Sequence, residues 1–279
     1  MRVVVHGATG AQGKPVATTL AERGVEVVPV SRSGAASTVR IDLSDPSTLA
    51  AAYRGADGVF FHFPLGATAE VENQWAANVA GAARSAGVRQ MVVSTSGHRP
   101  GTPAAEPVEL LVDRLRAASI TTTVVASLFY LENLLLPPVL DEVRGESELR
   151  YPLSDSTAIA WTSHLDVADI TATAFQRGTE APALVWSGHL PPLRGADLAA
   201  GFSAHAGRPI RFVPIAPTDF GHQVEPIIGA QATKGVVAGY EAIATAAEVA
   251  FPEHDSAAAR LDLAPRSVAA WLDELKVSI

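Results

Sequence analysis

The stretch VVVHGATGAQGKPV near the N-terminus constrains the fold more than any other part of the chain. An apolar run ends at Gly7, and Gly10 and Gly13 follow at G-x-x-G-x-x-G spacing before a helix-forming segment. Glycine permits a tight turn and a close backbone approach, and the free N–H groups at a helix N-terminus attract a pyrophosphate. The spacing therefore predicts a nucleotide-binding turn whose contacts come from Gly7, Thr9, Gly10, Gln12 and Gly13.

Short β-branched runs alternate with amphipathic segments along the first two-thirds of the chain. Strands that are apolar throughout and alternate with helices indicate a parallel sheet covered on both faces. We predict an α/β fold, a Rossmann-like doubly wound parallel sheet with a smaller C-terminal substrate-binding lobe. The predicted strands are 2–7, 25–32, 57–64, 89–97, 120–127 and 182–188, and the predicted helices are 14–24, 47–56, 71–87, 107–119 and 167–178.

Two later regions break this alternation. Residues 134–163 are rich in proline and turn formers, and after Gly188 the pattern changes to short helices and one strand, at 208–215. We interpret them as a lobe that closes against the carboxyl ends of the sheet, where open α/β sheets bind ligands. The predicted Rossmann domain is 1–133 with 158–187, and the predicted substrate-binding lobe is 134–157 with 188–279.

Composition narrows the class of partner. A net charge of −8 removes the main electrostatic support for nucleic-acid binding, and the absence of cysteine excludes disulfides and thiolate metal sites. No apolar run is long enough to span a membrane, and the scattered histidines lack metal-ligand spacing. We expect a cytoplasmic monomer or homodimer with a small-molecule substrate and with no metal, membrane or nucleic-acid partner.

The end of the second predicted strand indicates which dinucleotide is bound. A cation between two hydroxyls, Ser31-Arg32-Ser33, suits the 2′-phosphate that distinguishes NADPH/NADP+ from NADH. The alternative is that Arg32 is a solvated residue at a strand end. Asp42, followed by Leu43, is placed to accept a hydrogen bond from the adenine amino group, although an ordinary aspartate turn explains it nearly as well.

Several motifs together resemble one family. GATGAQG, SRS, IDLSD, MVVSTSG, TVVASLFYLEN, LDVADITATAF and LAAGFSAHAGRPIRFVPI are similar to segments of the atypical short-chain dehydrogenase/reductases, specifically the NmrA-like group. The resemblance covers nearly the whole chain. It implies the fold, and it leaves the activity open because the group includes both reductases and cofactor-binding regulators without turnover.

The resemblance also implies a catalytic arrangement from which this chain departs. Extended relatives carry a Ser or Thr at the end of the strand matched by MVVSTSG, and a Tyr and a Lys four residues apart on the next helix. Ser96 takes the serine position, whereas Ala105 and Glu109 stand where Tyr and Lys would be. The proton must then come from Ser96, His98 or Tyr130, or from a donor on the substrate itself.

Further site residues follow from position at strand ends. Phe63 and Pro64 are expected beside the nicotinamide half of the cofactor, with Ser94 nearby. Aromatic and polar side chains would suit a broad aromatic substrate, although each also fits a role in the core. The predicted substrate-binding residues are Ser96, His98, Tyr130, Asn133, Trp161 and Phe220.

Two classes of function are compatible with these residues. The first is an NADPH-dependent ketoreductase of a bulky aromatic secondary metabolite such as a polyketide, as in antibiotic biosynthesis, with substrate-assisted protonation. Quinone or imine reduction is an alternative within this class. The second is a non-catalytic NADP(H)-sensing regulator that binds a protein partner, which the loss of Tyr and Lys fits without further assumption.

Overall fold

The computed structural model describes residues 1–35, 37–64 and 66–279, and they form two compact units. Unit 1 comprises Met1–Ser127, His164–Ser187 and His254–Leu263, and unit 2 comprises Leu128–Ser163, Gly188–Glu253 and Ala264–Ile279. The predicted lobe began at residue 134, so unit 2 starts six residues earlier. A short segment near residue 260 also returns to unit 1, which the sequence did not indicate.

Unit 1 is built on a seven-stranded sheet in which each neighbouring pair of strands is parallel. The strand order is β11-β6-β5-β4-β1-β2-β3, so the direction of winding reverses between β1 and β4. Ligands of open α/β sheets bind at such a switch point. The predicted Rossmann-like doubly wound sheet is confirmed. Its strands are β1 Arg2–His6, β2 Glu26–Ser31, β3 Val39–Arg40, β4 Gly58–Phe61, β5 Gln90–Ser94, β6 Thr121–Ala126 and β11 Leu184–Trp186.

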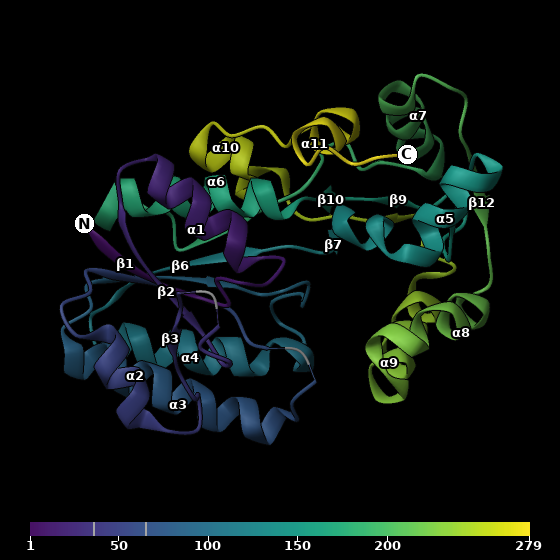
Figure 1. Ribbon diagram of the computed structural model, residues 1–279. Helices are drawn as coiled ribbons and strands as arrows, with labels where there is room; N and C mark the ends of the chain where they lie inside the picture. Colours follow the sequence, from purple (N-terminus) through teal and green to yellow (C-terminus); the bar gives the residue numbers. More distant parts are fainter. Residues whose placement is uncertain (36, 65) are drawn as a thin grey trace. The chain divides into compact units, whose positions relative to one another are not determined.

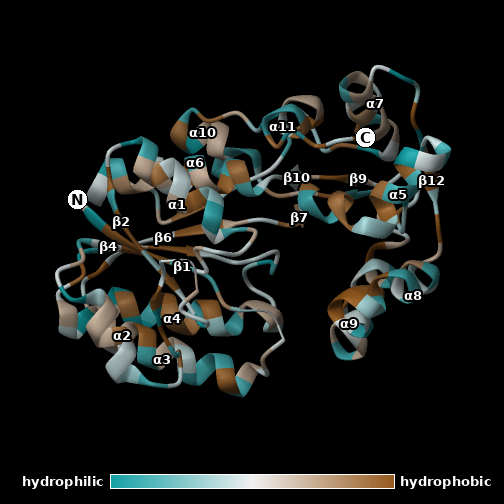
Figure 2. Ribbon diagram, viewed as in Figure 1, coloured by the Kyte–Doolittle hydropathy of each residue, from teal (hydrophilic) through white to brown (hydrophobic). Residues whose placement is uncertain are grey.

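Helices cover both faces of this sheet, with α1 and α6 on one side and α2, α3 and α4 on the other (Figure 1). The strands are mostly hydrophobic along their length, as expected for a sheet buried on both faces (Figure 2). On the α2–α4 side the core includes Leu49, Tyr53, Val79, Met91 and Leu111. The helices of unit 1 are α1 Gly13–Glu22, α2 Pro46–Tyr53, α3 Ala69–Ala86, α4 Glu106–Ala117, α6 His164–Arg177 and α10 Ala257–Leu261, with 3-10 turns at Pro103–Ala105, Gly178–Glu180 and, across the unit boundary, Glu253–Asp255.

Local sequence signals set the limits of α3, the helix that borders the candidate site. The Thr68 hydroxyl accepts a hydrogen bond from the Val71 amide at the N-terminus, and Gly87 ends the helix with a positive φ of 72°. Glu70 and Glu72 occupy the first turn, where negative charge is favourable beside the helix dipole.

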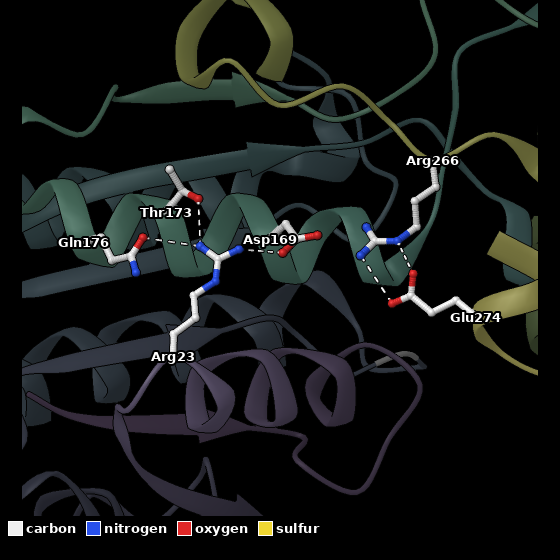
Figure 3. Close-up of polar contacts among 6 residues, drawn as sticks. All are labelled: Arg23, Asp169, Thr173, Gln176, Arg266 and Glu274. Atoms are coloured by element: carbon white, nitrogen blue, oxygen red, sulfur yellow. Dashed lines mark hydrogen bonds and ion pairs between the residues drawn. The ribbon is translucent and has the colours of Figure 1, made fainter. Parts of the chain in front are cut away.

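One arginine ties two helices of unit 1 together. Arg23, just after α1, places Nη2 2.6 Å from Asp169 Oδ1 on α6, and its Nη1 donates to Thr173 and Gln176 (Figure 3). Both members of the ion pair are only 27% exposed, so the contact is less screened by solvent than a surface pair. This network holds α1, and with it the glycine turn, against α6.

Unit 2 contains three two-stranded parallel sheets, β7 with β10, β8 with β12, and β9 with β13. Within it, Arg266 Nε lies 2.7 Å from Glu274 Oε2 and anchors the chain that precedes α11 (Figure 3). Its elements are β7 Phe129–Tyr130, a 3-10 turn Leu131–Leu135, α5 Pro137–Glu146, β8 Glu148–Tyr151, β9 Ala158–Ile159, β10 Trp161–Thr162, α7 Gly195–Ala206, β12 Arg211–Pro214, α8 Pro217–Ile228, α9 Ala230–Ile243, β13 Glu248–Val249 and α11 Val268–Glu274.

Across the described parts of both units, none of the helices is both long and apolar enough to cross a membrane.

Candidate active site

The predicted phosphate contacts lie where β1 passes into α1. Gly7 has a φ of +62°, which side chains rarely tolerate. A Cβ on Gly13 would lie 2.2 Å from the Gly7 carbonyl oxygen, so glycine is what lets α1 begin this close to β1. A Cβ on Gly10 would meet only that same oxygen, at 3.3 Å. The three glycines therefore do different things: Gly7 makes the turn, Gly13 permits the packing, and Gly10 keeps a side chain away from the Gly7 carbonyl.

The N-terminus of α1 suits an anion. Its first turn holds no acidic residue, and the side chain of Gln12, the N-cap residue, makes no capping hydrogen bond. Thr9 and Gly10 are exposed on the turn, whereas Gln12 is buried at the N-cap. Uncapped N–H groups and the positive end of the helix dipole are the features that bind phosphate.

The strand-end cluster after β2 divides into a structural and an exposed part. Ser31 is buried, and its Oγ lies 2.7 Å from Thr38 Oγ1 and accepts a hydrogen bond from the Gly34 amide. Arg32 and Ser33 are exposed. Ser31 thus organises the loop, whereas Arg32 is exposed, and its contact with a 2′-phosphate stays a prediction.

The predicted adenine contacts, Asp42 and Leu43, follow β3. Asp42 Oδ1 accepts a hydrogen bond from the Ser44 amide at 2.8 Å, which is the aspartate turn considered as the alternative. Leu43 is buried, and its carbonyl accepts from Asn78. One carboxylate oxygen is therefore committed to the turn.

Five predicted site residues, from the ends of β4 and β5, lie around one pocket of unit 1. Its remaining walls come from α3 and from the start of α4. The lining residues are Phe63, Pro64, Glu72, Ser94, Thr95, Ser96, His98, Ala104, Pro107 and Val108.

Ser96 has an unusual environment in this pocket. It adopts a φ of +52°, which is rare for a residue with a side chain. Its amide donates to Ser94 Oγ at 3.2 Å, while its own Oγ is buried and has no hydrogen-bond partner among the described residues. A buried hydroxyl without a partner is costly in a folded protein, so it is a candidate contact for a ligand.

The positions that the resemblance assigns to Tyr and Lys carry other roles. Ala105 is 1% exposed and ends the 3-10 turn before α4. The Glu109 carboxylate accepts a hydrogen bond from the Gly101 amide at 2.7 Å and so anchors the preceding loop. Ala105 has no proton to donate in place of the tyrosine, and Glu109 is not a cation in place of the lysine.

Two titratable residues of this region, His62 and Glu72, were not among the predicted site residues. A Cβ on Gly7 would lie 2.5 Å from His62 Nε2, so the imidazole packs against the glycine turn. His62 Nδ1 is 3.2 Å from the Phe63 carbonyl oxygen, which can only accept, so Nδ1 carries the proton. Burial lowers the pKa of His62 and raises the pKa of Glu72. Because side chains alternate between the two faces of a strand, the sequence could have shown that His62 faces the side opposite Phe61 and Phe63. No feature of the sequence indicated that Glu72 reaches the pocket.

His98, predicted as a catalytic residue, lines the same pocket but is exposed at its rim. Partial burial of the ring lowers the pKa of His98 below its ordinary value. Among the described residues, no group of three or more histidine or acidic side chains is arranged to hold a metal ion.

The predicted substrate-binding aromatics belong to unit 2, where they form a packed cluster. Tyr151 lies 5.7 Å from Trp161, 5.2 Å from Phe220 and 5.6 Å from Tyr240, measured between ring centroids. Its hydroxyl is hydrogen-bonded to that of Tyr240. Trp161 is fully buried and Phe220 is 2% exposed, so in this cluster both rings pack as core.

Two further candidates, Tyr130 and Asn133, also belong to unit 2. Tyr130 is 8% exposed and sits in β7, paired with Thr162. The Asn133 side chain hydrogen-bonds to Tyr151, while burial raises the pKa of that phenol well above its ordinary value. Tyr130, Asn133, Trp161 and Phe220 stay predictions as substrate contacts.

The switch point, the glycine turn and the exposed arginine after β2 define a protein of the Rossmann-like, dinucleotide-binding class. Residues 1–272 match the NmrA-like family, and the chain belongs to that family. The resemblance expected from the motifs is confirmed.

Individual relatives add detail. The NAD(P)H azoreductase of Xenophilus azovorans is 31% identical over 226 residues, which are 76% of this chain and 77% of the azoreductase. The triphenylmethane reductase of Citrobacter sp. matches with a TM-score of 0.77 and 17% identity over 99% of this chain and 100% of that chain. The NADPH-dependent quinone oxidoreductase QOR2 of Escherichia coli, solved with NADPH, gives a TM-score of 0.69 and 18% identity over 99% and 100% of the two chains. At these identities the two structures establish the shared fold.

Proposed function

We propose that this chain is an NADPH-dependent reductase of conjugated acceptors. After hydride addition, such an acceptor either delocalises the negative charge or, if it was a cation, becomes neutral. Quinones, the quinonoid tautomers of hydroxyazo dyes and triarylmethane cations are such acceptors. The azoreductase relative supports a reductase, and the triphenylmethane and quinone reductases that share the fold support this range of acceptors.

The residues of unit 1 fit the cofactor. Gly13 keeps α1 close to β1, Gly10 leaves room for a pyrophosphate above the uncapped helix N-terminus, and Arg32 is exposed beside the position of the adenosine ribose. NADPH, when bound, supplies the hydride. The protein binds and orients it, and Arg32 selects the 2′-phosphate.

The single observation that carries the choice of acceptor is the identity of Ala105 and Glu109. Reduction of a simple ketone leaves an alkoxide, whose conjugate acid has a pKa near that of water, about 16. Reduction of a quinone leaves a phenolate, whose conjugate acid has a pKa of about 10. The difference of about six pKa units means that the phenolate needs about 8 kcal/mol less stabilisation than the alkoxide.

A triarylmethane cation makes a still smaller demand, because hydride addition gives a neutral product and no proton is needed. An active site without the Tyr and Lys pair therefore suits these acceptors better than a ketone. The aromatic polyketide ketone expected from the sequence stays a prediction, since no described residue singles out a carbonyl.

The test is NADPH oxidation by the purified chain with three acceptors of similar size, a triarylmethane cation, a para-quinone and an aryl ketone. We expect turnover with the first two and a rate with the ketone at least about a thousandfold lower, within the range that loss of a general acid produces. Faster reduction of the ketone would refute the choice of acceptor. NADPH binding without oxidation by any acceptor would instead favour the regulator.

A further inference from the structure

The pocket at the ends of β4 and β5 occupies the region from which the family's tyrosine is missing. Its wall at the start of α4 consists of Ala104, Pro107 and Val108, which flank Ala105. These side chains carry no polar group. The polar lining comes instead from Glu72 on α3, from Ser94 at the end of β5, and from Thr95, Ser96 and His98 after that strand.

Glu72 is an uncommitted acid in this pocket. It lies in the first turn of α3 and is half-buried, unlike its neighbour Glu70, which is exposed. Among the described residues the Glu72 carboxylate has no hydrogen-bond or ion-pair partner, whereas the Glu109 carboxylate accepts a hydrogen bond from a backbone amide. Burial raises the pKa of Glu72 above its ordinary value of 4.5. Such a carboxyl group binds a proton more readily than an exposed one.

Ser96 shares the pocket and has the properties of a relay. Its hydroxyl is buried, without a partner among the described residues, and both donates and accepts hydrogen bonds. Ser94 Oγ holds the backbone of Ser96 in its left-handed conformation through the amide. Ser96 itself lines the pocket at the carboxyl edge of the sheet.

We propose that Glu72 is the proton source for acceptors whose reduction leaves a phenolate, such as a quinone, and that the Ser96 hydroxyl carries this proton to the acceptor. The inference rests on the proposed function. For a quinone, negative charge develops on the acceptor oxygen as the hydride adds, and the proton is transferred in the same step. This oxygen takes the proton of Ser96 Oγ as Oγ takes the proton of the Glu72 carboxylic acid. The Glu72 carboxylate then regains a proton from water, so the net reaction consumes one NADPH and one proton.

The titratable groups that line the pocket are Glu72, from α3, and His98, from the loop after β5; the lining residues from β4 and α4 do not titrate. Because an acid must be protonated to act, the rate of quinone reduction falls as the pH rises through the pKa of Glu72. A triarylmethane cation takes up hydride alone, so its reduction is independent of this route. The two acceptors thus separate proton delivery from hydride transfer.

The experiment measures single-turnover hydride transfer at saturating NADPH from about pH 5 to pH 9, with a para-quinone and with a triarylmethane cation. Glu72→Gln is compared with Glu70→Gln, which removes the same charge from the same helix turn. Ser96→Gly removes the hydroxyl and also suits the positive φ, so this variant keeps the fold. NADPH affinity is measured by fluorescence titration in each variant.

With the quinone we expect Glu72→Gln to lose about tenfold to a hundredfold, near the lower limit for a general acid, and to lose the pH dependence. Ser96→Gly has the same effect, and the double variant loses no more than either one because both act in one route. Quinone reduction by Glu70→Gln stays within about threefold of wild type. In every variant, NADPH affinity and the rate of triarylmethane reduction also stay within about threefold of wild type. In an NMR titration of the protein without cofactor, the carboxyl carbon signal of Glu72 is identified by its absence from Glu72→Gln. We expect this signal to titrate with a pKa above 4.5.

Wild-type rates and pH profile for the quinone in Glu72→Gln would overturn the inference, as would a loss seen only in His98→Ala. These results leave the proposed function intact if the wild-type chain reduces both acceptors. Failure of the wild-type chain to reduce either acceptor would refute the proposed function itself.

Discussion

Acidic pH should destabilise unit 1, because this unit buries histidine side chains in their neutral form. His6, at the end of β1, is 3% exposed, and its Nε2 lies 2.7 Å from the Tyr53 hydroxyl. The ring also packs edge-on against Phe61, at 5.0 Å between centroids. Burial, with a smaller contribution from the nearby His62, lowers the pKa of His6 from 6.5 to about 3.

The sign follows from proton binding in the two states. Below its unfolded pKa of 6.5, His6 binds a proton in the unfolded chain but not in the folded one, so stability is full above 6.5 and is lost as the pH falls toward 3. Between about pH 7.5 and pH 5 the loss from His6 is about 2 kcal/mol. Burial lowers the pKa of His164 to about 4, which contributes a similar loss. Together they remove about 4 kcal/mol from a typical stability of 5–15 kcal/mol.

The assay is urea unfolding at the two pH values. His6→Phe would leave the buried Tyr53 hydroxyl without its partner, so the double variant with Tyr53→Phe is compared with Tyr53→Phe alone. The double variant should lose about 2 kcal/mol less stability on acidification. His205→Gln is the control, because hydrogen bonding to Asp273 raises the pKa of His205 and its stabilisation persists in acid. An unchanged acid loss in the double variant would refute the reasoning.

Three further predictions concern the cofactor and the proton. Arg32→Ala should weaken NADPH by about tenfold to a hundredfold, as loss of one charge-assisted phosphate contact does, and leave NADH unchanged in a fluorescence titration; equal losses would contradict the assignment. Gly10→Val should abolish NADPH binding while melting near wild type, whereas Gly13→Ala should unfold at lower temperature because its Cβ meets backbone at 2.2 Å. Tyr130→Phe and His98→Ala should each keep more than about a thousandth of the wild-type turnover, and a larger loss in either would identify it as the acid.

The sequence predicts those parts of the fold that depend on local pattern. The alternation of apolar strands with helices gave all the long strands of unit 1, and the glycine spacing placed the turn between β1 and α1. The return of residues near 260 to unit 1 depends on tertiary packing, which no local periodicity encodes. The two-residue β13, at Glu248–Val249, is too short to leave a pattern.

The candidate site was predicted where strand ends specify it and missed where a long-range contact does. Ser94 ends β5, Ser96 and His98 follow it closely, and all three line one pocket. Glu72 reaches the same pocket from a helix surface, where an acidic residue in the first turn is commonplace. Ser31 and Arg32 are adjacent in sequence, yet one faces inward to hold the loop and the other is exposed. Which of the two side chains is buried depends on how the following loop folds back, and the sequence of the strand end alone does not show this.

Transfer of deuterium from cofactor to acceptor tests the proposed function most directly. NADPH carrying two deuterium atoms at nicotinamide C4 is mixed with the purified chain and a triarylmethane cation, and the colourless product is analysed by mass spectrometry. We expect one deuterium in each product molecule, and equal loss of NADPH and dye. Bleaching of the dye without deuterium, or tight binding of NADPH with no transfer to the cation or to a quinone, would contradict the assignment of this chain as a hydride-transferring reductase.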